Sequence, residues 1–173
     1  MILSILNQLE ATSSLNVKKD ILREHLDNEL LKNIFQATMD PRISYYIKKI
    51  PKYTTSDQPP VSLSTVIANL GRFSGRYVTG NAATKFLKEC LESLSSDDAE
   101  VLERIIKRDL RCGVKTGIVN DVFGEEFIYS HPVLLASKYE AKTVEALFKK
   151  NKHVIVQLKN DGLRCTIEVH PTE

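Results

Sequence analysis

Apolar residues recur at three- and four-residue spacing through most of this chain, from Met1 to about Phe123. That spacing matches the α-helix, which turns once in about 3.6 residues, and turn signals divide it into segments of helix length. Beyond residue 150 the period changes to about two residues, as in a strand. The sequence therefore predicts a mainly α protein, in which an all-helical part is followed by the beginning of a part that contains strands.

Two amphipathic helices are expected before residue 41. The second can be capped at its start by Asp27 or Asn28, and Pro41 stops it. After an exposed connection over 51–60, Ser62 can cap a helix that runs to about Phe73. Of the two helices before residue 41, the first is expected to have an apolar face made of Leu15, Ile21, Leu22 and Leu26.

The best-marked helix start is Ser95-Ser96-Asp97-Asp98, where hydroxyl groups can cap free amides and the aspartates favour the positive end of the helix dipole. Ion pairs between Glu100 and Arg104 and between Glu103 and Lys107 are expected on the outside of this helix. We expect it to end at Gly113. Its buried stripe is expected to contain Val101, Leu102, Ile105, Ile106 and Leu110.

The helical pattern breaks between about Glu125 and His131, and we predict two domains, 1–129 and 130–173. In the second, a short helix is expected near 141–150 and a β-hairpin around Asn160-Asp161-Gly162, with a strand on each side of this turn. The predicted fold is an all-helical domain followed by the first helix and β-hairpin of a truncated α+β domain.

Composition narrows the class of protein. Apolar residues make up 42% of the chain and charged residues 27%, which is typical of a soluble globular protein, and no apolar run is long enough to cross a membrane. We expect a cytoplasmic protein. Residues 1–129 contain 17 Lys and Arg against 17 Asp and Glu, so a basic surface there requires segregation of charge. The three cysteines predict neither zinc nor a disulfide framework.

Lys159-Asn160-Asp161-Gly162-Leu163-Arg164 has the form Lys-x-Asp-Gly-x-Arg that covalent nucleotidyltransferases use. From its spacing alone, the motif is equally well explained as an exposed hairpin turn. This motif and the residues around it resemble the ATP-dependent DNA ligases of T-even bacteriophages, and the resemblance extends over the whole chain. The other segments that carry this resemblance are Met1-Ile2-Leu3, Asp27 to Lys32, Tyr45 to Lys49, Thr79 to Ala83, Arg108 to Leu110 with Cys112-Gly113, and Leu135-Ala136-Ser137.

The resemblance implies that Lys159 attacks the α-phosphate of ATP and holds AMP as a phosphoramidate before the AMP passes to the 5′-phosphate of a nick. It also implies that Arg164 contacts the sugar and phosphate of the nucleotide, and Gln157 shares a strand face with Lys159, where it can contact adenine. ATP and Mg²⁺ are the implied cofactors, and the metal ligands are expected to lie outside this chain.

Two groups of residues are candidates for binding DNA phosphates. A cluster of cations straddles the Gly113 turn, and Thr79, Gly80 and Asn81 offer free amides at a helix start. For each cation, a solvated helix face is the plain alternative. Tyr45 and Tyr46 are expected to be buried or partly buried, and not to be platforms on which bases stack. The basic cluster comprises Arg104, Lys107, Arg108, Arg111 and Lys115, with Arg72, Arg76, Lys48 and Lys49 as further candidates.

Three functions remain open from the sequence. The first is the N-terminal part of a DNA ligase that acts on nicked duplex DNA in replication, repair and recombination. This chain alone is not expected to seal DNA, so the remaining motifs would come from a longer enzyme or a separate polypeptide. The second is a non-catalytic DNA-binding module from a truncated ligase gene, and the third is a helical scaffold for a protein partner. We expect a monomer without a membrane partner.

Overall fold

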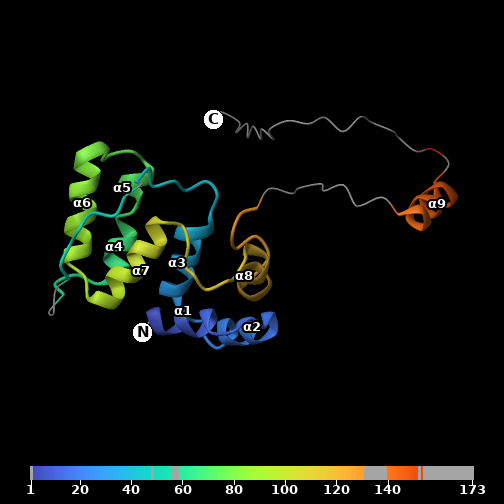
Figure 1. Cartoon of the computed structure of the whole chain (residues 1–173), viewed down its shortest axis with the longest axis horizontal. Helices are drawn as coiled ribbons and strands as arrows, with labels where there is room; N and C mark the ends of the chain where they lie inside the picture. Colours follow the sequence, from blue (N-terminus) through green and yellow to red (C-terminus); the bar gives the residue numbers. More distant parts are fainter. Residues whose placement is uncertain (1, 48, 56–58, 131–139, 152, 154–173) are drawn as a thin grey trace. The chain divides into compact units, whose positions relative to one another are not determined.

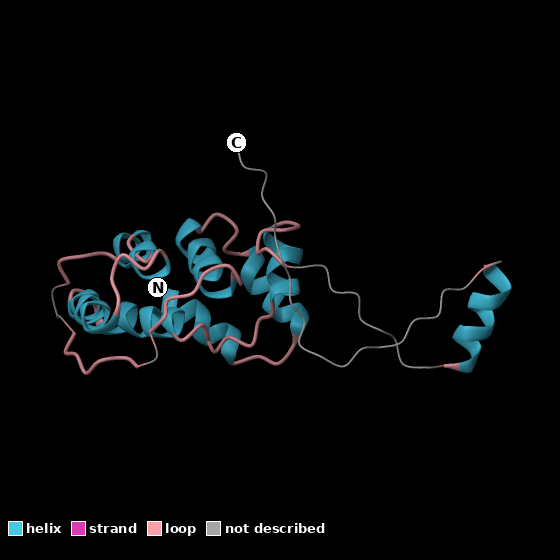
Figure 2. Ribbon diagram, turned by 90° about the horizontal axis from the view of Figure 1, so that it is seen from above, coloured by secondary structure: helices cyan, strands magenta, loops and turns pink. Residues whose placement is uncertain are grey.

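The computed structural model describes residues 2–47, 49–55, 59–130, 140–151 and 153, and all regular structure in these ranges is helical (Figures 1 and 2). The chain divides into two compact units, Met1–Pro132 and Val133–Glu173. The predicted β-hairpin lies outside the described residues. The helices are α1 Ile2–Glu10, α2 Leu15–Arg23, α3 Glu29–Met39, α4 Leu63–Ala68, α5 Gly71–Ser74, α6 Gly80–Glu92, α7 Ser96–Ile106, α8 Thr116–Phe123 and α9 Ala141–Lys150.

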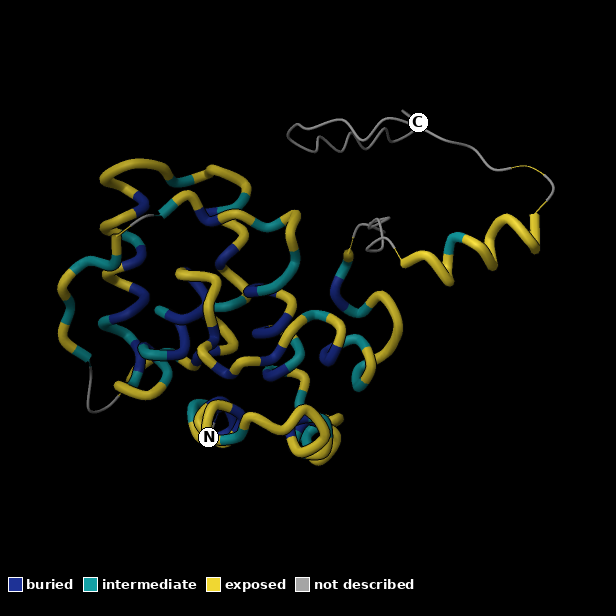
Figure 3. The backbone as a smooth tube through the Cα atoms, turned by 45° about the vertical axis from the view of Figure 1, so that its right-hand side comes forward, coloured by how far each residue is buried: buried dark blue, intermediate teal, exposed yellow. Residues whose placement is uncertain are grey.

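Helix α7 is the centre of the first unit, because it packs against α1, α3, α4 and α6. The predicted apolar stripe of α7 is confirmed, since Val101, Leu102 and Ile105 are fully buried. On the other side of the unit, α8 packs against α2 and α3. The buried segments of the backbone lie inside this helical assembly in Figure 3. Each CH₂ group buried in such a core stabilises the unit by about 0.8 kcal/mol.

Three of the predicted helix starts are confirmed in detail. The side chain of Asn28 accepts a hydrogen bond from the amide of Leu31 at 3.0 Å and caps α3. Ser62 caps α4 and Ser95 caps α7 in the same way. Each such cap contributes about 1 kcal/mol, because it satisfies an amide that has no partner within the helix.

The helix predicted from Ser62 to Phe73 is wrong in one respect, because it is interrupted between α4 and α5. The side-chain amide of Asn69 donates a hydrogen bond to the carbonyl oxygen of Thr65 at 2.8 Å. The backbone amide of Leu70 then donates to the carbonyl of Ile67, three residues earlier. This is the hydrogen-bond spacing of a 3₁₀ turn and not of an α-helix. A local side-chain contact therefore ends α4 where the apolar spacing continues.

The apolar face predicted for the helix at residues 15–26 is also partly wrong. Helix α2 ends at Arg23, and Leu15 and Leu26 are exposed. The face that α2 buries carries Leu22 and, one turn earlier, Lys18, of which only 5% is exposed. Residues four apart share a helix face, so the buried face of α2 combines one of the predicted leucines, Leu22, with a lysine that was not predicted to be buried.

Helix α7 ends at Ile106, so the prediction that Gly113 ends it is wrong. Arg108 adopts a left-handed conformation (φ 57°) at the position where glycine usually ends a helix. The amide of Arg108 bonds to the carbonyl of Ile105 at 2.9 Å, and that of Asp109 bonds to Arg104 at 3.0 Å. This pair of bonds is a Schellman motif in which an arginine takes the place of glycine.

The second unit contributes one described helix, α9, where the sequence predicted it. None of its described residues is buried, and Leu147 and Phe148 expose 49% and 62% of their surface. Among the described residues of both units, the helices are too short and too polar to cross a membrane.

Candidate nucleic-acid interface

Two hollows lie on the first unit, and both are lined by Tyr45, Tyr46, Ile47 and Ile50 of the loop Ser44–Ile50. The larger, which we call the α6 groove, has a volume of about 660 Å³ and is also lined by Thr79, Gly80 and Asn81. The second hollow, of about 510 Å³, is lined by Lys107 and Arg108. The fold therefore brings the two candidate phosphate-binding groups to neighbouring positions, although they are separated in the sequence.

The start of α6 leaves its first amides without a side-chain cap in the described structure. Thr79 is extended and its side chain makes no capping hydrogen bond, while Gly80 follows with φ at +55°. A helix start of this kind carries a partial positive charge and suits anions. Thr84 continues the same groove wall one turn further along α6.

The turn after α7 exposes two further cations, Arg111 and Lys115. The backbone amide of Arg111 donates to the carboxylate of Asp109 at 2.9 Å, which fixes this turn. The guanidinium group of Arg111 donates no hydrogen bond to any residue that the structure describes. An exposed guanidinium in this state is available to phosphate oxygens.

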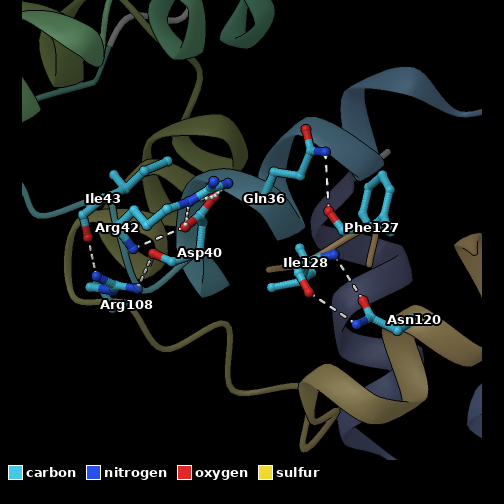
Figure 4. Close-up of polar contacts among 8 residues, drawn as sticks. All are labelled: Gln36, Asp40, Arg42, Ile43, Arg108, Asn120, Phe127 and Ile128. Carbon is cyan, nitrogen blue, oxygen red and sulfur yellow. Dashed lines mark hydrogen bonds and ion pairs between the residues drawn. The ribbon is translucent and has the colours of Figure 1, made fainter. Parts of the chain in front are cut away.

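Arg108 has a second role that its sequence position did not reveal (Figure 4). Its guanidinium donates hydrogen bonds to the carbonyl oxygens of Thr38 at 3.1 Å, Asp40 at 2.7 Å and Ile43. The carbonyl of Thr38 belongs to the last turn of α3, the negative end of its dipole, and those of Asp40 and Ile43 follow it. A guanidinium carries five N–H groups, so two remain for another acceptor after the α3 end is satisfied.

Arg104 is not on the outside of α7 as predicted. Only 5% of its surface is exposed, and it donates to the carboxylate of Glu100 at 2.7 Å and to the carbonyl of Leu110 at 3.0 Å. The predicted ion pair with Glu100 is confirmed, but its arginine is held inside the fold. Arg104 therefore joins α7 to the turn that follows it and does not belong to the exposed basic cluster.

Gly113 sits against a buried lysine that the sequence did not single out. The amine of Lys18 donates to the carbonyl oxygen of Cys112 at 2.6 Å. A β-carbon on Gly113 would lie 2.5 Å from that amine, and Gly113 has φ at +60°. The turn after α7 is therefore held to α2 by a contact that leaves room only for glycine.

The prediction that both tyrosines are at least partly buried holds for Tyr45 and is wrong for Tyr46. Tyr45 donates its hydroxyl to the carbonyl of Ala37 at 2.7 Å, and burial raises the pKa of Tyr45 to about 12. Tyr46 exposes 64% of its surface. The guanidinium carbon of Arg76 lies 5.1 Å from the centre of the Tyr46 ring.

Left-handed backbone is concentrated at this surface. Tyr46 and Arg76 have φ of 56° and 57°. Each such residue costs about 1–2 kcal/mol, whereas an exposed cation–π contact contributes about 0.5–1 kcal/mol. The contact between the two side chains therefore does not offset the backbone strain, and strain of this kind is typical of functional sites. The described non-glycine residues with positive φ are Tyr46, Arg76, Arg108, Arg111 and Glu126.

Glu103 pairs with Lys107, one of the two cations that line the second hollow. Its carboxylate accepts hydrogen bonds from Lys107 at 2.6 Å and from the Tyr53 hydroxyl at 2.7 Å. Partial burial acts to raise the pKa of Glu103, but these two hydrogen bonds together with the positive charges of Lys107 and Arg111 outweigh it, and the pKa is lowered. The predicted pair with Lys107 is thus confirmed, and at neutral pH the ammonium group of Lys107 is matched by a negative charge.

Four predicted site residues lie outside the described residues. Three are the residues expected to bind the nucleotide, Gln157, Lys159 and Arg164, and the fourth is Lys48. Within the ranges that the structure describes, no group of three His, Cys, Asp or Glu side chains is placed to hold a metal ion.

No family model matches the chain. The chain is 38% identical over 180 residues to the DNA ligase of Enterobacteria phage T4, and equally to that of Enterobacteria phage T6. The match covers the whole chain and 36% of each relative. A solved structure, Pmar-Lig_PreS3, aligns with 70% of the chain and 29% of its own length at a TM-score of 0.64 and 22% identity, so the two share a fold. The resemblance in the sequence is therefore confirmed: the chain is a homologue of the phage T4 and T6 DNA ligases and spans about a third of their length.

Proposed function

We propose that the unit Met1–Pro132 binds duplex DNA at a nick, as part of an ATP-dependent DNA ligase. The observation that carries the proposal is the placement, in a homologue of two DNA ligases, of cations and free helix amides on both sides of the loop Ser44–Ile50. These groups suit phosphate oxygens, which are alike in every DNA sequence. Binding should therefore be independent of sequence.

The charge of the surface supports this reading, although the unit as a whole is balanced. Lys49 and Arg76 line the α6 groove, and Lys107 and Arg108 line the second hollow. A nucleic-acid surface can arise from such local segregation without a high net charge. Each phosphate neutralised by these cations releases counterions, so affinity should fall steeply as salt rises.

We propose further that Lys159 accepts AMP from ATP. Its neutral amine would attack the α-phosphorus, form a P–N bond and expel pyrophosphate. Gln157 would contact adenine and Arg164 the sugar and phosphate of the nucleotide. The support for these roles is the Lys-x-Asp-Gly-x-Arg motif in a DNA ligase homologue. In the same proposal the family's Mg²⁺ is held by residues other than the described ones, and the ligase serves DNA replication, repair and recombination.

Titration of the chain with a fluorescent duplex tests DNA binding. We expect saturable binding whose affinity is lost as salt is raised, and we expect Arg111→Ala to weaken it about three- to tenfold with a salt slope smaller by about one counterion. Arg23→Ala is the matched control, because Arg23 is an exposed arginine of α2 that pairs with Asp20. Binding that ignores salt, or equal losses in the two variants, would contradict the proposed surface.

Replacement of Glu103 by glutamine is expected to strengthen duplex binding. The change removes a negative charge and frees Lys107 for phosphate, while glutamine can still accept the Tyr53 hydroxyl. We expect a gain of about threefold to tenfold in affinity at low salt and a salt slope steeper by up to about one counterion. Glu92→Gln is the control, since it breaks an exposed pair with Lys88 on α6. An unchanged or weaker affinity for Glu103→Gln would show that Lys107 does not contact DNA.

A further inference from the structure

Tyr46 presents an exposed aromatic ring at the edge of the α6 groove. The neighbouring Tyr45 is buried and bonded to Ala37, which anchors the loop, whereas Tyr46 is 64% exposed and lines the groove. The loop is therefore fixed on one side of the backbone and offers a ring on the other. An exposed aromatic ring beside cations is the basic element of surfaces that bind unpaired nucleotides.

Arg76 complements this ring. Its guanidinium lies over the Tyr46 ring, and the backbone amide of Arg76 bonds to the carbonyl of the buried Phe73 at 3.0 Å, which ties the arginine to the core. Its side chain makes no hydrogen bond to the residues that the structure describes. A stacked guanidinium keeps its N–H edges for phosphate oxygens, so the pair offers an aromatic face and a phosphate contact in one place.

The rest of the groove fits a nucleotide in size and chemistry. Its volume of about 660 Å³ lies in the range of small-molecule sites. Lys49, Asn81 and Thr84 supply polar groups, while the partly exposed Ile47, Ile50 and Val78 supply apolar surface. In an intact duplex the bases are stacked on one another and present no free face, whereas an unpaired nucleotide at a gap or strand end does.

We propose that Tyr46 and Arg76 bind an unpaired nucleotide beside a break in DNA, with the base or sugar on the Tyr46 ring and its phosphate on Arg76. This inference rests on the proposed DNA-binding function and adds a preference to it. The contacts to DNA phosphates bind any duplex, whereas the Tyr46 ring in the α6 groove distinguishes a duplex with a gap from an intact one. A free single strand lacks the duplex part of the interface and should bind more weakly than the gapped duplex.

The test compares three fluorescent DNAs of one sequence: intact duplex, duplex with a one-nucleotide gap, and single strand. We expect the chain to prefer the gapped duplex over the intact one by about three- to tenfold, on the scale of one stacked base. Tyr46→Ala should remove most of that preference and leave the affinity for intact duplex within about twofold of the unchanged chain. Arg76→Ala should also remove the preference, but it should weaken binding to intact duplex as well, because Arg76 is one of the cations proposed to contact phosphates. Tyr46→Phe should retain the preference, because it keeps the ring.

Tyr77→Ala is the matched control, since Tyr77 is 82% exposed and next to Arg76 but does not line the groove. Circular dichroism during heating verifies that each variant is folded. An equal loss on all three DNAs, or a preference unchanged in Tyr46→Ala, would overturn the nucleotide site and leave the proposed function intact. Absence of salt-sensitive binding to every DNA would overturn the proposed function together with this site.

Discussion

Replacement of Gly113 by alanine is expected to lower the free energy of unfolding of the Met1–Pro132 unit by about 3 kcal/mol. About 1–2 kcal/mol of this is the cost of a β-carbon at a φ of +60°. The remainder comes from Lys18, because the new β-carbon would lie 2.5 Å from its amine. The amine must then move and lose its bond to Cys112, and a hydrogen bond from a charged donor contributes about 1.5–3 kcal/mol.

Gly80→Ala isolates the contribution of the backbone. Gly80 has nearly the same φ, +55°, but a β-carbon there would meet nothing within 4 Å. Urea unfolding followed by circular dichroism should therefore show a loss of about 1–2 kcal/mol for Gly80→Ala. Equal losses in the two variants would show that the contact with Lys18 contributes nothing.

A double-mutant cycle provides the second control. Lys18→Met removes the amine and keeps an unbranched side chain, so Gly113→Ala should cost less in that background than in the original chain. We expect a coupling of about 1–2 kcal/mol, in the range measured for residues in direct contact. A coupling near zero would assign the whole cost of Gly113→Ala to the backbone.

Local features of the fold could be predicted from the sequence because their causes lie within a few residues. Asn28 and Ser95 cap the helices that follow them, as their positions before an apolar run indicate. Glu103 pairs with Lys107 because residues four apart meet on a helix. Each of these contacts is formed inside one element and does not depend on how the helices pack.

Contacts between distant residues could not be predicted in this way. Arg104 and Lys18 look like surface cations in sequence, yet each is buried and donates a hydrogen bond to a carbonyl oxygen of the turn after α7. For Lys18 that acceptor is 94 residues away. Arg108 shows the same limit, since its three acceptors belong to the segment that ends α3. The spacing of apolar residues along the sequence cannot predict such distant hydrogen-bond partners.

The candidate interface was predicted in part. The helix start at Thr79-Gly80-Asn81 and the cations at Lys107 and Arg111 were identified from composition and spacing. Tyr46 and Arg76 were not placed together, because their contact depends on two left-handed residues that lie 30 positions apart in sequence. Neither residue is a glycine, so the sequence contains no conformational signal at either position.

Replacement of Lys159 by alanine is expected to abolish adenylation, which is the largest effect that we anticipate. The chain spans 36% of its phage relatives, so we would place it in the phage T4 DNA ligase in exchange for the matching segment. Incubation of this chimera with ATP labelled at the α-phosphate should transfer the label to the protein. Without the Lys159 amine no P–N bond can form, and labelling should fall by at least about a thousandfold, on the scale seen when a covalent nucleophile is removed.

Two controls make the assignment specific. Lys159→Arg keeps a positive charge, but a guanidinium stays protonated at neutral pH and cannot attack, so it should be as inactive as alanine. Lys150→Ala removes a lysine from the end of α9 and should leave labelling unchanged. Label retained in the Lys159→Ala chimera, or located by mass spectrometry on another residue, would remove Lys159 from the proposed mechanism. If neither the parent chimera nor its variants took up label while the chain alone still bound duplex, the chain would be a DNA-binding module without adenylation chemistry.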